Sequence, residues 1–313
     1  MSDIRQRSST YRVVENVVQT DDGMRTHYWE YIPDRPITDA VIYTTGGWPV
    51  DSTWLEDIYE PLVEAGVPVV RYDQRGSGAS SHPRRTRNYS MPALARELDA
   101  VITATAAGRR VCVLGQAWGA NIAAEHIHLF PGTIDTLFSI SAPSQDMAFT
   151  ALRRNTRRAV RDPALRAKVF GQWAILWYWF ALALPVLPEL VFATGLPTAA
   201  LNRTIAQRDA AGGRPATRRP VHLTRADTGR AAQKYRWFVR HRVFTPAYDE
   251  LPVDHLYVFQ LTGERLQTPM LLDGLAERTP DLHLTHVDGD HYNYRYGATG
   301  AAIQQTILTA ITG

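Results

Sequence analysis

Short apolar runs alternate with amphipathic stretches along the first half of the chain. Continuous apolar runs of this length, often β-branched, are typical of strands that are buried on both faces of a sheet. These strand candidates, with two β-rich runs around the turn signal Asp21-Asp22-Gly23, are residues 11–18, 25–32, 40–44, 67–72, 111–114 and 137–140. Apolar residues recur at helical spacing between them, over residues 52–65, 91–106 and 120–130. The alternation predicts a mostly parallel sheet with helices on both faces.

The alternation stops after Ser144. Residues 147–250 are rich in arginine and aromatic side chains and have a helical pattern. Beyond them, two more strand candidates and a closing helix are residues 255–261, 282–287 and 299–312. The simplest interpretation is an α/β core, formed by residues 1–146 and 251–313 around an eight-stranded sheet, with a helical cap inserted at residues 147–250.

One apolar stretch bears on whether the chain enters a membrane. The 16 residues from Trp173 to Pro188 carry no charge. A membrane helix needs about 18–20 apolar residues, and Pro185 and Pro188 interrupt this run near its end. Its aromatic residues lie inside the run instead of at both ends, where interfacial belts occur. We therefore expect a buried helix that covers a pocket, and no membrane span.

Composition narrows the class of protein. The length of 313 residues suits one large domain. Basic residues (34) barely exceed acidic ones (31), and they are scattered, which disfavours a nucleic-acid surface. The single cysteine, Cys112, excludes an intrachain disulfide framework. The first residues lead into no apolar segment, so we expect a cytoplasmic protein, monomeric or homodimeric, that acts on a small molecule.

The segment Gly115-Gln116-Ala117-Trp118-Gly119 stands between a predicted strand and a predicted helix. A sharp turn in this context is typical of a nucleophile elbow, where flanking glycines relieve crowding. The N-terminus of the helix stabilises negative charge beside the turn. Ala117 occupies the nucleophile position, and a methyl group cannot attack a substrate.

Other parts of a hydrolytic site follow at the ends of predicted strands. Gly46-Gly47-Trp48-Pro49 suits an oxyanion hole formed by the backbone N–H groups of Trp48 and Trp118. Glu264 and His291 each follow one of the last two strands. The order of nucleophile position, acid and base along the chain is that of the α/β-hydrolase fold.

These motifs resemble the α/β-hydrolase superfamily, and within it the epoxide-hydrolase branch, over nearly the whole chain. The segment from Arg71 to Ser80, RYDQRGSGAS, is similar to the signature of the family's fourth strand, and the segment from Ser141 to Asp146 is similar to its entry into the cap. The elbow resembles His-Asp-Trp-Gly, with Gln116 and Ala117 replacing the first two residues. The oxyanion turn resembles His-Gly-x-Pro, with Gly46 replacing the histidine.

Two tyrosines of residues 147–250 are similar to the cap tyrosines of epoxide hydrolases. Tyr178 stands seven residues before Pro185, and Tyr235 lies in a basic aromatic stretch. The resemblance implies that both phenols donate hydrogen bonds to an epoxide oxygen while a carboxylate at position 117 attacks the ring carbon.

His291, oriented by Glu264, would then hydrolyse the resulting ester. The aromatic cap suggests a bulky apolar or aromatic substrate of the kind found in natural-product biosynthesis, held by residues such as Trp177, Trp179 and Trp237.

Ala117 leaves several functions open. The chain is either an engineered knock-out of an aspartate nucleophile, or a native enzyme in which His291 and Glu264 catalyse cyclisation, elimination or conjugate addition without a covalent intermediate. A serine esterase or haloperoxidase whose serine is replaced, and a non-catalytic ligand-binding protein, are the alternatives. Haloalkane dehalogenases share the elbow but lack the tyrosine pair. We expect no cofactor, since the sequence contains no Gly-x-Gly-x-x-Gly motif, and no metal, since the histidines lack paired spacing.

Overall fold

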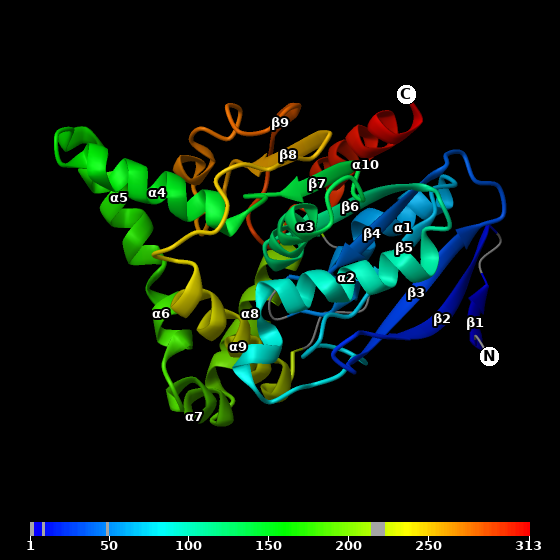
Figure 1. Ribbon diagram of the computed structural model, residues 1–313, viewed down its shortest axis with the longest axis horizontal. Helices are drawn as coiled ribbons and strands as arrows, with labels where there is room; N and C mark the ends of the chain where they lie inside the picture. The colour runs from blue at the N-terminus through cyan, green and yellow to red at the C-terminus, as the bar shows by residue number, and fades with distance from the viewer. Residues whose placement is uncertain (1–2, 8–9, 48–49, 214–222) are drawn as a thin grey trace.

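A nine-stranded sheet forms the centre of the molecule, in the order β1-β2-β3-β5-β4-β6-β7-β8-β9 (Figure 1). The computed structural model describes residues 3–7, 10–47, 50–213 and 223–313. The strands are β1 (Asp3–Arg7), β2 (Tyr11–Gln19), β3 (Arg25–Pro33), β4 (Ala40–Thr45), β5 (Val69–Tyr72), β6 (Arg110–Gln116), β7 (Thr136–Ile140), β8 (His255–Leu261) and β9 (Leu282–Val287). Pairing is antiparallel from β1 to β5 and parallel from β5 to β9. The predicted fold class is confirmed.

The sheet has one strand more than the eight expected. β1 contains four polar residues and Ile4, and it pairs only with β2 at the edge of the sheet. Because an edge strand buries little apolar surface, it needs no apolar alternation that a sequence pattern would reveal. The central strands β4, β6 and β7 are almost wholly buried, as their continuous apolar runs predict.

Helices cover both faces of the sheet. The elements of the core are η1 (Ser52–Leu55), α1 (Glu56–Glu64), η2 (Thr86–Tyr89), α2 (Met91–Thr105), α3 (Trp118–Leu129), η3 (Pro269–Leu272) and α10 (Gly297–Thr312). Alternate residues of β4 point to opposite faces. Val41 and Tyr43 join one apolar cluster with α2 and α3, whereas Ile42 joins another with α1 and α10.

Six helices of the described residues lie between β7 and β8, and we name them the cap helices. They are α4 (Gln145–Ala159), α5 (Pro163–Ile175), α6 (Trp177–Ala183), α7 (Leu187–Ala193), α8 (Leu196–Ala211) and α9 (Arg225–His241). In Figure 1, α4 to α7 extend away from the sheet on the side opposite to β1. Buried side chains of the cap helices, among them Trp179 and Phe238, belong to the same apolar cluster as α2 and α3.

The uncharged run from Trp173 to Pro188 is not the single buried helix that the sequence suggested. It is divided between the end of α5, the whole of α6 and the start of α7, and the side chain of Trp177 is 67% exposed. Within the described part of the chain, no single helix is long and apolar enough to cross a membrane. One bent pair, 163–183 with 187–193, passes the test of length and composition across a 91° bend.

Candidate active site

The elbow predicted at Gly115–Gly119 connects β6 to α3. Ala117 adopts φ +48° and ψ −110°, a backbone conformation that L-residues rarely take. A Cβ atom on Gly115 would lie 2.4 Å from the backbone nitrogen of Ala120, and one on Gly119 would lie 2.9 Å from the carbonyl oxygen of Thr45. Both glycines are therefore required by close backbone contacts, and the turn raises residue 117 at the carboxyl end of a central strand.

Glu264 and His291 are brought together by the loops that follow β8 and β9. The Gly263 N–H donates to the carbonyl oxygen of Gly289 at 2.8 Å, and a Cβ atom at position 263 would come equally close to that oxygen. This contact between the loops places His291 Nδ1 2.7 Å from Glu264 Oε2. The predicted acid and base are thus hydrogen-bonded to each other, and they form an ion pair when the imidazole is protonated.

The surroundings of this pair keep Glu264 ionised and make His291 a stronger base. Burial alone raises the pKa of Glu264, but the His291 charge and hydrogen bonds from His291, the Leu266 N–H and the Ser141 hydroxyl lower that pKa to about 2. Burial likewise lowers the pKa of His291, and the Glu264 charge and hydrogen bond outweigh this effect, so that the pKa is raised. A carboxylate held in this way keeps the proton of the imidazole on Nδ1 and leaves Nε2 for proton transfer.

A cavity of about 690 Å³ lies above the elbow and contains most of the predicted site residues in its wall. Among the described residues that line it are Ala117, Trp118, Tyr178, Tyr235, His291, Trp177 and Trp179. The other lining side chains come largely from α6, α7 and α8 and are mainly Leu, Val, Pro, Ala and Phe. No Asp, Glu, Lys or Arg occurs among the described residues that line the cavity. The cavity therefore suits an uncharged, apolar ligand.

The two cap tyrosines lie next to each other. Their ring centroids are 5.8 Å apart, and the ring of Tyr235 meets that of Trp118 edge-on at 5.1 Å. Burial raises the pKa of Tyr178 to about 12 and also raises the pKa of Tyr235 well above its usual value of 10. Both phenols consequently keep their protons at neutral pH and can donate hydrogen bonds to an oxygen in the cavity.

Two predicted site residues, Trp48 and Trp237, are not among the described residues of the cavity wall. Trp48, the first proposed oxyanion donor, lies outside the described residues. Trp237 is not among the described residues that line the cavity: its ring stacks on His241 at 4.8 Å and lies 5.5 Å from the Arg242 guanidinium. Its position on α9, two residues after Tyr235, turns it to another side of the helix.

Sequence reasoning gave no role to a set of hydrogen-bonded polar side chains at the cavity, two of which, Trp54 and Gln116, line its wall. The Trp54 indole N–H donates to Gln116 Oε1 at 2.8 Å, and Gln116 Nε2 donates to the His291 carbonyl oxygen at 3.0 Å. Lys234 Nζ donates to Gln74 Oε1, whose amide nitrogen donates to the Gly46 carbonyl oxygen. These contacts join the elbow to the histidine loop and α9 to the turn at Gly46.

Burial lowers the pKa of Lys234 to about 8. The sequence signal for this set was Gln116 and Gln74 themselves, each of which lies inside a recognised motif. Their partners come from distant segments of the chain.

Comparisons with solved structures identify relatives of the fold. An epoxide hydrolase from Bacillus megaterium in complex with its product matches with a TM-score of 0.72 at 14% identity, covering 95% of this chain and 100% of that one. Epoxide hydrolase A from Mycobacterium thermoresistibile matches with a TM-score of 0.64 at 17% identity, covering 95% and 96%. Identities this low establish the fold, and a fold alone does not assign an activity.

Among curated proteins, the chain is similar to "Probable oxidoreductase EphD" of Mycobacterium tuberculosis and Mycobacterium bovis. The identity is 33% over 196 residues, which is 61% of this chain and 32% of each relative. The chain thus spans about a third of the length of these relatives. The family model described as "alpha/beta hydrolase fold" matches residues 45–294, which include the elbow, the cap helices, Glu264 and His291. The chain therefore belongs to the α/β-hydrolase fold family.

Proposed function

We propose that this protein opens the epoxide of a bulky, uncharged, apolar substrate by acid/base catalysis without a covalent intermediate. The observation that carries the proposal is the wall of one cavity: His291, Tyr178 and Tyr235 line it together with Ala117. Ala117 offers no attacking atom, whereas Glu264, His291 and the two phenols supply the groups that an acid/base reaction requires. The epoxide hydrolases among the fold relatives support the substrate class.

The proposed reaction adds a hydroxyl group across one carbon–oxygen bond of the epoxide. His291 Nε2 accepts the proton of a hydroxyl, from water or from the substrate itself, while the Nδ1–H stays bonded to Glu264. The hydroxyl oxygen bonds to a ring carbon as the carbon–oxygen bond of the epoxide breaks. Tyr178 and Tyr235 donate hydrogen bonds to the leaving oxygen, which takes up, through solvent, the proton that His291 accepted. Water gives a diol, and a hydroxyl of the substrate gives a cyclic ether.

The proposed reaction is not an oxidation or a reduction. The name of the curated relatives belongs to proteins of which this chain covers 32%. The chain itself has no Gly-x-Gly-x-x-Gly motif, and the proposed steps transfer protons and no hydride.

Two epoxides distinguish the source of the hydroxyl. One is a naphthyl glycidyl ether, chosen because the Bacillus megaterium enzyme binds a naphthyloxy-propanediol product; the other is an apolar hydroxy-epoxide. Chromatography measures diol and cyclic ether. His291→Ala should lower turnover about 100-fold or more, and Tyr178→Phe and Tyr235→Phe should each lower kcat. His286→Ala, an exposed histidine on β9, is the matched control and should have no effect. Turnover that survives His291→Ala contradicts the proposal.

A second candidate, a hydrolase whose aspartate nucleophile has been replaced, is favoured by the elbow geometry that Ala117 retains. Ala117→Asp should then form diol from the glycidyl ether. In a single turnover in water labelled with heavy oxygen, that variant should release unlabelled diol, because the first oxygen comes from the carboxylate. Direct attack by water gives labelled diol instead.

Ala117→Ser tests the esterase alternative, since a serine at the elbow should hydrolyse an aryl ester. If the wild-type protein binds the epoxides but neither it nor any of these variants turns them over, the protein is a ligand-binding member of the family.

A further inference from the structure

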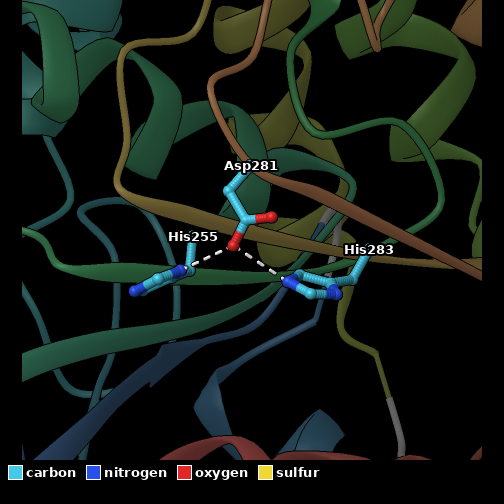
Figure 2. A group of neighbouring side chains, drawn as sticks. All are labelled: His255, Asp281 and His283. Carbon is cyan, nitrogen blue, oxygen red and sulfur yellow. Dashed lines mark hydrogen bonds and ion pairs between the residues drawn. The ribbon is translucent and has the colours of Figure 1, made fainter.

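A cluster of three side chains lies at the amino ends of the last two strands, away from the elbow. His255 is the first residue of β8, Asp281 directly precedes β9, and His283 is the second residue of β9. Figure 2 shows the Asp281 carboxylate between the two imidazoles. His255 Nδ1 lies 2.7 Å and His283 Nε2 lies 2.9 Å from the same oxygen, Asp281 Oδ2.

The backbone holds these three residues in register. β8 and β9 are parallel neighbours, with Leu256 opposite Leu282 and Tyr257 opposite His283. The Leu256 N–H donates to the carbonyl oxygen of Asp281 at 2.9 Å. The ring of Tyr257 stacks on that of His283 with centroids 4.3 Å apart and planes inclined by 9°. The two imidazoles are therefore carried by strands, one of them against a stacked ring, and the backbone of Asp281 is bonded to β8.

We propose that His255, Asp281 and His283 form a Zn²⁺ site that joins β8 to β9. Two imidazole nitrogens and one carboxylate oxygen are a donor set typical of zinc, and they leave a fourth, tetrahedral position for water. Their ligand atoms lie within 4.8 Å of one another, so a zinc ion with bonds of about 2.0–2.2 Å replaces the protons they share after small side-chain movements. Mg²⁺ and Ca²⁺ fit poorly, because they prefer sites built from oxygen ligands.

The spacing of these residues along the sequence gives no recognisable metal-site pattern. Asp281 and His283 alone are a common pair, and His255 is far from them in the chain. Only the parallel pairing of β8 with β9 adds the second imidazole. The carboxyl ends of the same two strands lead into the loops that carry Glu264 and His291. The ion would therefore connect the amino ends of the two strands that support this pair.

The test uses the full chain, stripped of metal with a chelator and titrated with ZnCl₂ by calorimetry. One Zn²⁺ per chain should bind, and Co²⁺ bound in its place should show the visible absorption of tetrahedral cobalt. His283→Ala and Asp281→Asn should each weaken zinc binding by at least about 100-fold. Circular dichroism verifies that both variants fold, which is expected because these side chains are about half exposed.

His286→Ala is again the control, since this histidine lies on the same strand and is exposed but does not belong to the cluster. It should leave zinc affinity unchanged. Zinc should also raise the melting temperature of the wild-type protein and of His286→Ala, but not that of His283→Ala. Binding that persists in His283→Ala, or that is lost only in His291→Ala, overturns the proposal.

Discussion

The backbone at Ala117 is in a strained conformation, although its methyl side chain brings no chemistry to the site. Its φ of +48° and ψ of −110° suit glycine, and a residue with a Cβ atom in such a region costs about 1–3 kcal/mol. The close contacts of Gly115 and Gly119 hold the turn in this shape. The backbone is thus built to present a side chain at position 117, although the chain supplies only a methyl group.

Replacing that methyl group by hydrogen should therefore stabilise the protein. Ala117→Gly is expected to raise the free energy of unfolding by about 1 kcal/mol, because relief of strain exceeds the added flexibility of the unfolded chain. Urea denaturation measures the difference. Ala302→Gly, at an exposed position inside α10, should instead lower the free energy of unfolding by about 1 kcal/mol. A destabilised Ala117→Gly variant would show that the turn is not strained.

The pair of Glu264 and His291 makes stability depend on pH. Glu264 has a lowered pKa, so its contribution is present above its unfolded value of 4.5 and is lost as the pH falls toward about 2. His291 has a raised pKa, so its contribution is present below its unfolded value of 6.5 and is lost as the pH rises through the folded value. The pair stabilises the fold most between these two unfolded values.

Glu264→Gln should accordingly lower the free energy of unfolding most near pH 5.5, by roughly 2–3 kcal/mol. The loss should be clearly smaller at pH 9. Denaturation with urea at both pH values measures this difference. Glu277→Gln, at an exposed position, should have a small effect that does not change with pH. A Glu264→Gln penalty that is equal at both values would contradict the ion pair.

Among the elements, Arg242 connects the end of α9 to two other helices. Its guanidinium donates to Glu125 of α3 at 3.0 Å and to Asp146 of α4 at 3.1 Å, and all three side chains are buried. Burial raises the pKa of both carboxyl groups, and the Arg242 charge opposes that rise. The charged side chains depend on one another, because none has bulk water around it.

Removing the shared cation should leave two buried carboxyl groups without their partner. Arg242→Ala is expected to lower the free energy of unfolding by about 3–5 kcal/mol. The exposed pair of Arg96 and Asp21, 3.7 Å apart, provides the control: Arg96→Ala should cost less than about 1 kcal/mol. Equal losses in the two variants would mean that the buried network adds no more than a surface pair.

The elements that the sequence predicted best are those that bury apolar surface. Strands β4, β6 and β7 and helices α2 and α3 were visible as apolar runs or helical spacing, since the same side chains form the core. β1 was missed because its edge position demands no such pattern. The run from Trp173 to Pro188 predicts one helix, which is wrong because apolar composition does not show where a helix breaks. The chain turns at Leu176 and again at Pro185, which divides the run.

The order of residues along the chain and their positions after predicted strands were enough to identify Ala117, Glu264 and His291. Of these three, Ala117 and His291 line the cavity. The bond from Lys234 to Gln74 and the cluster of His255 with Asp281 and His283 depend on contacts between distant segments. Such contacts leave no periodic signal in a sequence. The sequence likewise does not show that the Trp237 side chain points away from the cavity.

At the scale of the whole molecule, one apolar cluster extends through both the cap helices and the core. It contains Val41 of β4 and Leu98 of α2 together with Trp179 and Phe238 of the cap helices. Arg242 and the Lys234–Gln74 bond add polar connections across the same boundary. Over the described residues, the buried side chains of the cap helices therefore belong to clusters that they share with the core.

Unfolding should consequently be a single cooperative transition. Half of the tryptophans of the chain, four of eight, lie in the cap helices, so their fluorescence weights these helices more heavily than far-ultraviolet circular dichroism does, which reports on all elements. The two signals should change at the same urea concentration. An earlier change in fluorescence would reveal that the cap helices unfold on their own.

The shape of the elbow also has a genetic consequence. An alanine codon that ends in a pyrimidine becomes an aspartate codon when its middle base alone mutates. Because the turn around position 117 already has the conformation that presents such a side chain, this mutation would need no compensating change in the backbone. Under the proposed function, a gene with such a codon would gain or lose a covalent mechanism in one evolutionary step, while the imidazole, the phenols and the apolar wall would be inherited intact.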